Sequence, residues 1–571
     1  MPITTDGSNL GNPALPGSPG QQNEPTPQAP AVTTAPSSVG SPIPPPSKIA
    51  LAPAKDRPSH GNVVIISRFT ELAPLALRVG GTLHCVNRWY RARNYYNGLC
   101  SIADTLQDAL RNRPSAVIFD HVGDSSEPLG KIADALRARG LPIWGGGEVN
   151  DLLENNRAYG LQVALRCGLN VPRTLFFDRE RGEPWSTVNL GGKQRIFRVR
   201  GGLDEAQAFV AAAGGRWVVK LFNSSAASST FVAESAEQMT WRLAHMREAG
   251  ELESNQRFLL QQHLKGIEVS TEFLVAQGEV VAPPNGTIET KKAFADDLGP
   301  NSGCQTSTCW VYPNDKALIV KQTIGRPEFR AWLKNPTGPG GKTFPPLNSP
   351  IDVNCIISDE DHDAYVLEWT ARVGYSAIFA HMVLMDGDLR KIFTDLAHGK
   401  PPDFKYRTGE FGYAMRVHIP PAPFADAYIP PKGQDNWAFA ERLLEPARHV
   451  HIGGPVDDPN VWLTDAQTDP GGGVRTAGVD GAVMEITARD SDIEMCADRA
   501  TSLFKDIDLP DAFARVGQDG VKRAGEDTQR LLRFGYEVPG VELERPEPDR
   551  DIPKDPPLRP LVSVVMERKS A

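Results

Sequence analysis

The sequence predicts an α/β protein that begins with a doubly wound parallel sheet. Three short apolar runs have the composition of buried strands: VVIIS at 63–67, AVIFD at 116–120 and LPIW at 141–144. Patterns at 102–110 and 129–139 lie between these runs and predict helices. Strands that alternate with helices are typical of parallel sheets flanked by helices.

A second unit is expected to follow from residue 147. Residues 148–167 predict one long helix, and 216–221 with 230–233 predict a hairpin around the loop NSSAASS. The remaining elements expected in this unit are helices at 236–248 and 377–389 and strands at 258–262, 268–275, 279–281 and 365–369.

A third unit is expected from about residue 412. It should hold strands at 413–419, 461–463 and 481–488, a helix at 493–504 and a mainly helical segment at 511–534. The predicted division of the chain is a proline-rich tail (1–58), three folded domains (59–146, 147–405 and 406–510), a helical segment (511–536) and an extended tail (537–571).

Composition limits the classes of function. Residues 1–58 contain no Phe, Trp, Tyr or Cys and are expected to form a disordered tail. The formal net charge of -9 gives no indication of a nucleic-acid partner. No apolar run approaches the ~20 residues of a membrane span, and no secretory signal is recognised. Seven cysteines without a C-x-x-C pair fit a reducing compartment, so we expect a cytoplasmic protein.

Two stretches have features of a nucleotide site. Lys220 ends the apolar strand RWVVKL and precedes a loop of small polar residues, where an ammonium can pair with a phosphate. The stretch LLQQHLKGIEVS at 259–270 turns at Gly266 and places Glu268 on the returning strand. Backbone groups there could read an adenine edge, and the carboxylate could hold ribose hydroxyls. Taken alone, these residues also fit an ordinary strand end and a hairpin with an exposed glutamate.

A third stretch, ETKKAFADDLGPNSG at 289–303, gathers lysines and a Gly-Pro-Asn turn. Lys291 and Lys292 could neutralise phosphates, and backbone N–H groups of the turn could bind an anion. The alternative for this stretch is a solvated charged face.

A fourth stretch, YVLEWTARVG at 365–374, places a carboxylate on an apolar strand. Glu368 and Thr370 are expected on one face, because side chains alternate along a strand. Such an oxygen pair suits magnesium, with ATP phosphates completing the coordination. Arg372 would follow on the same face and could stabilise a transferring phosphoryl group. An edge strand with an exposed glutamate is the alternative.

In this order, the four stretches resemble phosphoribosylamine–glycine ligase, an ATP-grasp family that makes glycinamide ribonucleotide in purine synthesis. The resemblance runs from about residue 63 to 509, and 141–174 looks like the family's linker and first ATP-grasp helix. The four stretches look like, in turn, its ATP-lysine strand, its adenine hinge with the ribose glutamate, its substrate loop with the GPN turn, and its metal strand. Residues after 412 resemble the small C-terminal domain that covers the site.

The resemblance implies a doubly wound N-terminal domain, an ATP-grasp core and a small C-terminal domain. It also implies an ADP-forming ligase that uses ATP and Mg²⁺ to join a carboxylate to an amine through an acyl phosphate. The implied roles are ATP binding (Lys220, Gln262, Leu264, Glu268), substrate binding (Lys291, Asn301, Gly303), metal binding (Glu368, Thr370) and catalysis (Arg372, Lys292).

The sequence departs from the family at several of these positions. The flap loop NSSAASS lacks glycine and a second lysine, and glutamines replace the acidic hinge residues. Thr370 replaces the asparagine of the metal strand, and Tyr375 replaces an aspartate. The glycine-rich loop after the first strand, which holds the phosphate of phosphoribosylamine in the family, reads SRFTELAP. In that loop Glu71 is expected to place a negative charge where the phosphate should lie.

Three functions remain open at this point. One is a carboxylate–amine ligase that joins a small carboxylate, for example an amino acid, to an amine other than phosphoribosylamine. The second is a phosphoribosylamine–glycine ligase with divergent loops. The third is an ATP-grasp scaffold that binds a nucleotide without catalysis.

Overall fold

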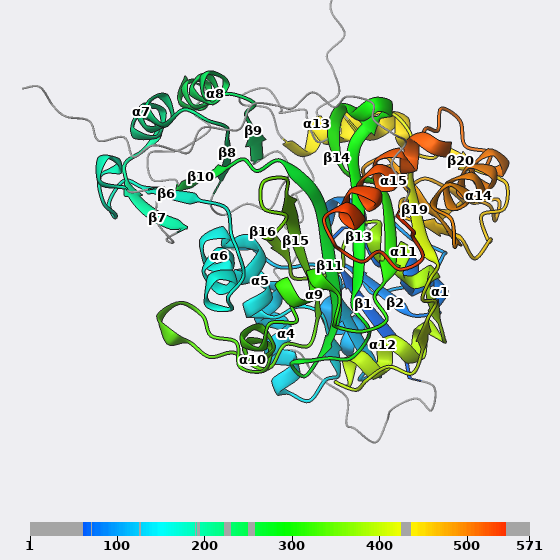
Figure 1. Cartoon of the computed structure of the whole chain (residues 1–571). Helices are drawn as coiled ribbons and strands as arrows, with labels where there is room; N and C mark the ends of the chain where they lie inside the picture. The colour runs from blue at the N-terminus through cyan, green and yellow to red at the C-terminus, as the bar shows by residue number, and fades with distance from the viewer. Residues whose placement is uncertain are drawn as a thin grey trace, which may run out of the picture. The chain divides into compact units, whose positions relative to one another are not determined.

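The computed structural model describes residues 61–69, 71–124, 127–188, 190, 195–221, 230–248, 257–423 and 436–543 (Figure 1). The predicted tail at 1–58, most of the tail at 537–571 and the flap loop lie outside these residues. All seven cysteines fall within them and are free thiols. In the described part of the chain, no helix is long and apolar enough to cross a membrane.

The first described unit is a five-stranded parallel sheet in the order β3-β2-β1-β4-β5. β1 is buried along its whole length, as expected of a central strand with both faces covered. Its strands are β1 (Val63–Ser67), β2 (Thr82–Cys85), β3 (Ser101–Ile102), β4 (Ala116–Phe119) and β5 (Ile143–Trp144). Its helices are α1 (Ala73–Arg78), α2 (Arg88–Ala92), α3 (Leu106–Leu110) and α4 (Leu129–Ala138). The predicted parallel α/β unit is confirmed, and the short strands β2 and β3 are additional.

The single helix predicted at 148–167 is wrong. The structure has two helices, α5 (Glu148–Asn155) and α6 (Arg157–Arg166). Asn156 separates them, because its side chain accepts a hydrogen bond from the Tyr159 N–H and so starts a new helix.

A second five-stranded sheet has the order β7-β6-β10-β8-β9. The predicted hairpin is present, since β8 and β9 pair antiparallel. The strands are β6 (Thr174–Asp178), β7 (Ile196–Arg200), β8 (Trp217–Leu221), β9 (Thr230–Val232) and β10 (Phe258–Gln262). The helices of this segment, α7 (Leu203–Ala213) and α8 (Ala236–Glu248), pack on each other.

A nine-stranded sheet joins the central and C-terminal parts of the chain. Its order is β16-β15-β11-β13-β14-β19-β24-β21, and β12 pairs with β11. The strands are β11 (Gly266–Ala276), β12 (Glu279–Val280), β13 (Asn285–Phe294), β14 (Leu298–Val311), β15 (Pro350–Ser358), β16 (Ala364–Thr370), β19 (Phe411–His418), β21 (Val461–Leu463) and β24 (Ala482–Asp490). Because β14 pairs with β19, the sheet is continuous across the predicted domain boundary at residue 406.

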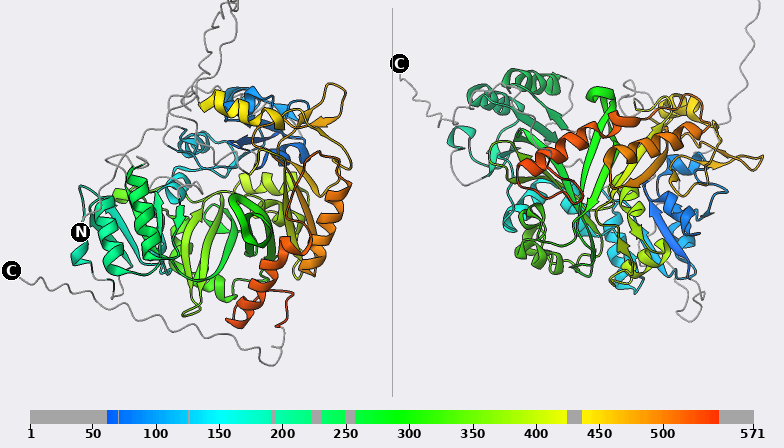
Figure 2. Two further views of the ribbon diagram at one scale, coloured as in Figure 1. Left: turned by 90° about the horizontal axis from the view of Figure 1, so that it is seen from above. Right: turned by 45° about the vertical axis from the view of Figure 1, so that its right-hand side comes forward.

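The remaining elements flank this sheet or connect its strands. The helices are α9 (Leu318–Gln322), α10 (Pro327–Lys334), α11 (Ala377–Val383), α12 (Leu389–Ala397), α13 (Asn436–Leu444), α14 (Ile493–Asp506) and α15 (Gly517–Arg533). Short strands are β17 (Met385–Asp386), β18 (Lys405–Tyr406), β20 (His451–Ile452), β22 (Gln467–Thr468) and β23 (Val474–Arg475). The helix predicted at 377–389 therefore ends early, because the chain turns into β17. α15 packs on α14 and across β13 and β14 (Figure 2).

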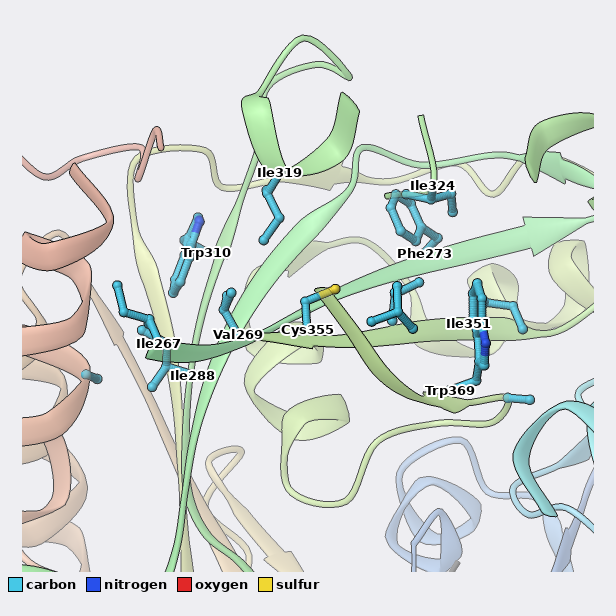
Figure 3. Packing of buried hydrophobic residues seen from close by; sticks show 14 of the residues in the cluster. Ile267, Val269, Phe273, Ile288, Trp310, Ile319, Ile324, Ile351, Cys355 and Trp369 are labelled. Atoms are coloured by element: carbon cyan, nitrogen blue, oxygen red, sulfur yellow. The ribbon is translucent and has the colours of Figure 1, made fainter. Parts of the chain in front are cut away.

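One face of the large sheet forms the main hydrophobic core (Figure 3). Ile267, Val269 and Phe273 occupy alternate positions of β11 on this face. They pack with Trp310, Trp369 and other buried residues from neighbouring strands. Because side chains alternate along a strand, the residues between them must point to the opposite face of the sheet.

Candidate active site

The face of the large sheet opposite the main core carries polar side chains, and we call it the site face. On β11 it holds Glu268 and Ser270, which alternate with the core residues Ile267 and Val269. Ser270 lies opposite Asn354 of β15, and Asn354 lies opposite Glu368 of β16. Polar groups from several strands thus share one face.

A β-bulge directs Glu368 to the site face. The pairing of β15 with β16 slips by one residue, so that Asn354 pairs with Glu368 and Cys355 with Val366, leaving Leu367 unmatched. Val366 and Glu368 are two residues apart and would share a face in a regular strand. The bulge lets Val366 join the core while Glu368 points into the site.

Five charged side chains converge at this face, and we call them the charged cluster: Lys220, Arg157, Glu268, Lys291 and Glu368. Two ion pairs tie them together. Lys291 Nζ lies 3.3 Å from Glu268 Oε1, and Arg157 Nη1 lies 2.9 Å from Glu368 Oε2. Lys220, the penultimate residue of β8 in the second sheet, interacts electrostatically with both carboxylates. The structure therefore brings together the lysine and both carboxylates that the sequence placed on three strands.

The cluster shifts the protonation of its members. Burial and the positive charge of Arg157 lower the pKa of Lys220 to about 8. Burial alone would raise the pKa of Glu368, but Arg157, Lys220 and Lys291 together lower it to about 2. Lys291 likewise lowers the pKa of Glu268. At neutral pH the cluster therefore holds two carboxylates among three cations, and Glu289 borders it beside Lys291. Three cations at one face are suited to phosphates.

The surroundings of Glu368 fit a magnesium ion that also binds phosphate oxygens. Among the described residues, no group of three or more His, Cys, Asp or Glu side chains is arranged to hold a metal by itself. The Thr370 hydroxyl accepts a hydrogen bond from Asn354 Nδ2 at 3.0 Å, beside the ionised Glu368. These are oxygen donors, which magnesium prefers, and a nucleotide would supply the missing ligands.

The segment between β10 and β11 links the second sheet to the large one. It contains the predicted hinge residue Leu264, which is half-buried, as is Gln262 at the end of β10. The Gln262 N–H donates to the Arg173 carbonyl at 2.8 Å. β10 and β11 lie in different sheets, so this stretch is a connection between sheets and not a simple hairpin.

Arg372 lies beyond the end of β16 and is held by neighbouring groups. Its Nε donates to Glu154 Oε1 at 3.0 Å, and its guanidinium stacks 4.2 Å from the ring centre of Tyr375. β16 ends at Thr370, so the alternation of the strand does not extend to Arg372 and does not by itself place this side chain. Arg372 acts electrostatically on Glu289 and so borders the site face.

The substrate loop differs from its prediction. Lys292 points away from Lys291 and donates to the Gly299 carbonyl at 3.2 Å, so the two lysines do not converge. The predicted Gly-Pro-Asn turn is wrong, because this segment belongs to β14 and Asn301 pairs with Lys292. The chain reverses instead at residues 295–297. Gly303 is exposed and lies close to Arg416, with a positive φ of 78°.

The loop after β1 also departs from expectation. Glu71 is only 3% exposed, and burial next to Asp120 raises its pKa to about 8. Burial therefore disfavours the charged form of Glu71, in contrast to the negative charge expected in this loop. Arg68 pairs with Asp124 and with Glu127 at 3.4 Å.

Comparison with known proteins gives the same resemblance as the motifs. No family model matches the chain. It is 24% identical over 289 residues to phosphoribosylamine–glycine ligase of Halalkalibacterium halodurans, covering 50% of this chain and 59% of that protein. It is 23% identical over 402 residues to the Streptomyces coelicolor protein of the same name, covering 70% of this chain and 80% of that protein. The chain is similar to phosphoribosylamine–glycine ligases.

Solved structures agree at the level of the fold. Phosphoribosylamine–glycine ligase from Thermotoga maritima aligns with a TM-score of 0.55 at 13% identity, covering 79% of this chain and 98% of that one. The biotin carboxylase domain of 2-oxoglutarate carboxylase from Hydrogenobacter thermophilus, in complex with MgADP, ADP and bicarbonate, aligns with a TM-score of 0.50 at 12% identity, covering 84% and 100%. The expected ATP-grasp arrangement is confirmed, and the low identities fit a divergent relative.

Two residues of the site were missed from the sequence. Arg157 is buried, begins α6 and pairs with Glu368. It was missed because the sequence predicted one continuous helix at this position. Asn354 lies in the run PIDVNCIIS, whose alternation of polar and apolar residues was a usable signal. Polar residues at alternate positions of a buried strand point to one functional face.

Proposed function

We propose that this protein is an ADP-forming carboxylate–amine ligase that works through an acyl phosphate. The observation that carries this proposal is the charged cluster, in which Lys220, Glu268 and Glu368 come from three strands and two different sheets. Such a convergence of charges around the buried Lys220 indicates a ligand site, because buried charges are costly unless they serve a ligand or a partner.

In this reaction ATP transfers its γ-phosphoryl group to a carboxylate, and an amine then displaces phosphate. We assign Lys220, Lys291 and Arg157 to the phosphates, Glu268 to the ribose, and the Gln262–Leu264 connection to the adenine. Glu368 and Thr370 would hold Mg²⁺, which neutralises phosphate charge when bound. Arg372 would stabilise the transferring group from the border of the site face. Lys292 keeps no assigned role, since its ammonium lies on Gly299.

Hydroxylamine provides a test that does not require the natural amine. It attacks acyl phosphates to give a hydroxamate and phosphate, so it reports activation of any carboxylate. Wild-type protein with Mg-ATP, hydroxylamine and a panel of carboxylates should release ADP and hydroxamate together for at least one of them. Lys220→Met should abolish both products, and Lys131→Met, at an exposed position of α4, should not. Wild-type protein that binds no ATP at millimolar concentration would contradict the proposal.

The amine acceptor is proposed to differ from phosphoribosylamine. The loop that holds its phosphate in the family corresponds here to 67–74, where Arg68 is the single Lys or Arg. The second phosphoribosylamine loop of the family corresponds to HVGDSSEP at 121–128, which contains neither Lys nor Arg. Arg68 is already neutralised by Asp124 and Glu127. Burial lowers the pKa of His121 well below its ordinary value, so this imidazole is uncharged at neutral pH. These contacts leave little attraction for a phosphate.

The acceptor can be tested with phosphoribosylamine made in place from ribose 5-phosphate and ammonia. With glycine and Mg-ATP, we expect no glycinamide ribonucleotide above the background without protein. Its formation at about 1 s⁻¹ or faster would show instead that the protein is a phosphoribosylamine–glycine ligase with altered loops.

A further inference from the structure

The helix α15 lies beyond the part of the chain that resembles the ligase family, which ends near residue 509. It packs against β11, β13 and β14 of the large sheet. Val521 and Ala524 are buried and belong to the main hydrophobic core. The Thr306 hydroxyl of β14 donates to the Gly520 carbonyl at 2.8 Å. α15 is therefore an integral part of the folded chain, although the family motifs do not include it.

The residues just before α15 hold the turn that follows the proposed phosphate lysine. Arg515 is buried, and its Nη1 donates to Asp297 Oδ1 at 2.9 Å and to the Lys292 carbonyl at 3.4 Å. Lys292 directly follows Lys291 on β13, so these hydrogen bonds fix the strand that carries the phosphate lysine. This is the first of two anchors by which α15 contacts the site.

The C-terminal end of α15 holds a second segment of the site. Arg530 Nη2 donates at 2.7 Å to Oδ1 of Asp359, which lies in the turn between β15 and β16. The Asp359 N–H donates to the Lys265 carbonyl at 3.0 Å, in the connection between β10 and β11 that we assign to the adenine. Glu268 follows three residues after Lys265 and pairs with Lys291. The two anchors of α15 therefore lie on the two segments that meet at Glu268.

Arg523 lies on α15 between these two anchors. After Lys291 it is the cation that acts most strongly on Glu268, and both cations lower the pKa of this carboxyl group. The Arg523 side chain is 34% exposed, and its Nε lies 3.4 Å from Asp527 Oδ2. Asp527 also accepts from Arg530 Nη1 at 2.9 Å, so it keeps a cation when Arg523 turns toward Glu268.

Binding of ATP changes the demand for cations around Glu268. Its carboxylate is paired with Lys291 in the structure, at 3.3 Å. The proposed function assigns both Lys291 and Lys220 to the phosphates, and an ammonium that turns to a phosphate leaves the carboxylate. An ionised carboxylate that loses its partner in a half-buried place is destabilised. Arg523 is the remaining cation that acts on it.

We propose that α15 completes the nucleotide site and that Arg523 positions Glu268 against the ribose hydroxyls. This inference rests on the proposed function, which assigns Glu268 to the ribose. A carboxylate has two oxygens, so one can pair with a guanidinium while the other accepts from a hydroxyl. The contribution of Arg523 to binding therefore depends on whether the nucleotide carries those hydroxyls.

The experiment compares the binding of Mg-ATP with that of its dideoxy analogue, which lacks both ribose hydroxyls. Calorimetry is carried out on the full-length wild type, Arg523→Ala, the conservative variant Arg523→Lys and Glu268→Gln. Arg533→Ala is the matched control, because Arg533 is an exposed arginine at the end of the same helix. Wild type and the control should both bind ATP more tightly than the analogue.

Arg523→Ala should weaken ATP binding about threefold to tenfold, as for the loss of one partly exposed charge contact, and should leave binding of the analogue unchanged. The preference for ATP should therefore shrink in this variant, as it does in Glu268→Gln, and Arg523→Lys should keep most of it. A helix that only stabilises the fold would affect both nucleotides alike. Equal losses for the two nucleotides, or an unchanged preference in Arg523→Ala, would overturn the inference.

Failure of the proposed function gives a different result. Wild type that binds neither nucleotide at millimolar concentration overturns the proposed function and the role of Arg523 together. Wild type that prefers ATP to the same degree with and without Arg523 overturns the inference alone. A preference that depends on Arg523, in a protein that forms no hydroxamate from any carboxylate, supports the inference while the proposed catalysis fails.

Discussion

Replacing Lys220 by Met should remove ATP binding and also make the ligand-free protein more stable. Lys220 is 7% exposed, and burial and Arg157 lower its pKa from 10.5 to about 8. That difference means that the protonated amine destabilises the folded protein by about 3 kcal/mol below pH 8. Met keeps the length and apolar contacts of the side chain without the charge. The free energy of unfolding of Lys220→Met should therefore exceed that of the wild type by close to this value.

The dependence on pH has a definite sign. Between about pH 8 and pH 10.5 the unfolded chain holds the Lys220 proton and the folded protein does not. Stability of the wild type therefore rises with pH through this window, while the variant lacks this contribution. The advantage of Lys220→Met should be full at pH 7 and clearly smaller at pH 9.5.

Urea denaturation midpoints at the two pH values measure this effect, and calorimetry measures ATP binding. Lys131→Met, which removes an exposed lysine, should leave the midpoint nearly unchanged at both pH values. A Lys220→Met protein that is less stable than wild type at pH 7 would refute the reasoning. The reasoning would also be refuted if the stability difference between Lys220→Met and wild type stayed the same at pH 9.5, because such a difference could not come from the buried charge.

Three further predictions concern other parts of the site and chain. Glu368→Gln should abolish turnover across a magnesium titration with an unchanged circular dichroism spectrum; full turnover would exclude a metal role. Arg515→Ala removes a guanidinium that binds Asp297 at 2.9 Å and holds the turn between β13 and β14. The KM for ATP should therefore rise severalfold, and limited proteolysis should cut near 295–297. An unchanged KM and cleavage pattern would mean that the turn is stable without Arg515. Deletion of residues 1–58 should leave ATP affinity and melting temperature unchanged, and a drop of several degrees would show that this segment packs on the folded part.

The strongest parts of the fold were predictable because their signals are local. Runs such as VVIIS can only be buried strands or buried helix segments, and their short length decides for strands. The helix break at Asn156 was not predictable in this way. Apolar periodicity continues through it, and only the capping hydrogen bond to Tyr159 separates α5 from α6. The break positions Arg157 at the start of α6, where it reaches Glu368.

Site residues were predictable where the sequence of a single strand marks them. They were not predictable where their position depends on how two strands pair. Lys220, Glu268 and Glu368 stand out within their own segments, and the structure brings them together. The bulge at Leu367 depends on how β15 and β16 align, which a single strand does not reveal. The same limit applies to Glu272 and Asp352, which are 80 residues apart and meet only through strand register.

Thr370 stands where the metal strand of the resembled family carries an asparagine. Asn354 lies directly opposite Glu368 and its amide donates to the Thr370 hydroxyl at 3.0 Å. The amide that the family carries on the metal strand is thus present on the neighbouring strand. Asn354→Ala should therefore weaken magnesium activation about tenfold, the effect of losing one polar contact to a charged site. Adding Thr370→Asn to that variant returns the amide to the family's position and should restore activity. A double variant as weak as Asn354→Ala alone would mean that Asn354 supports the sheet and not the metal.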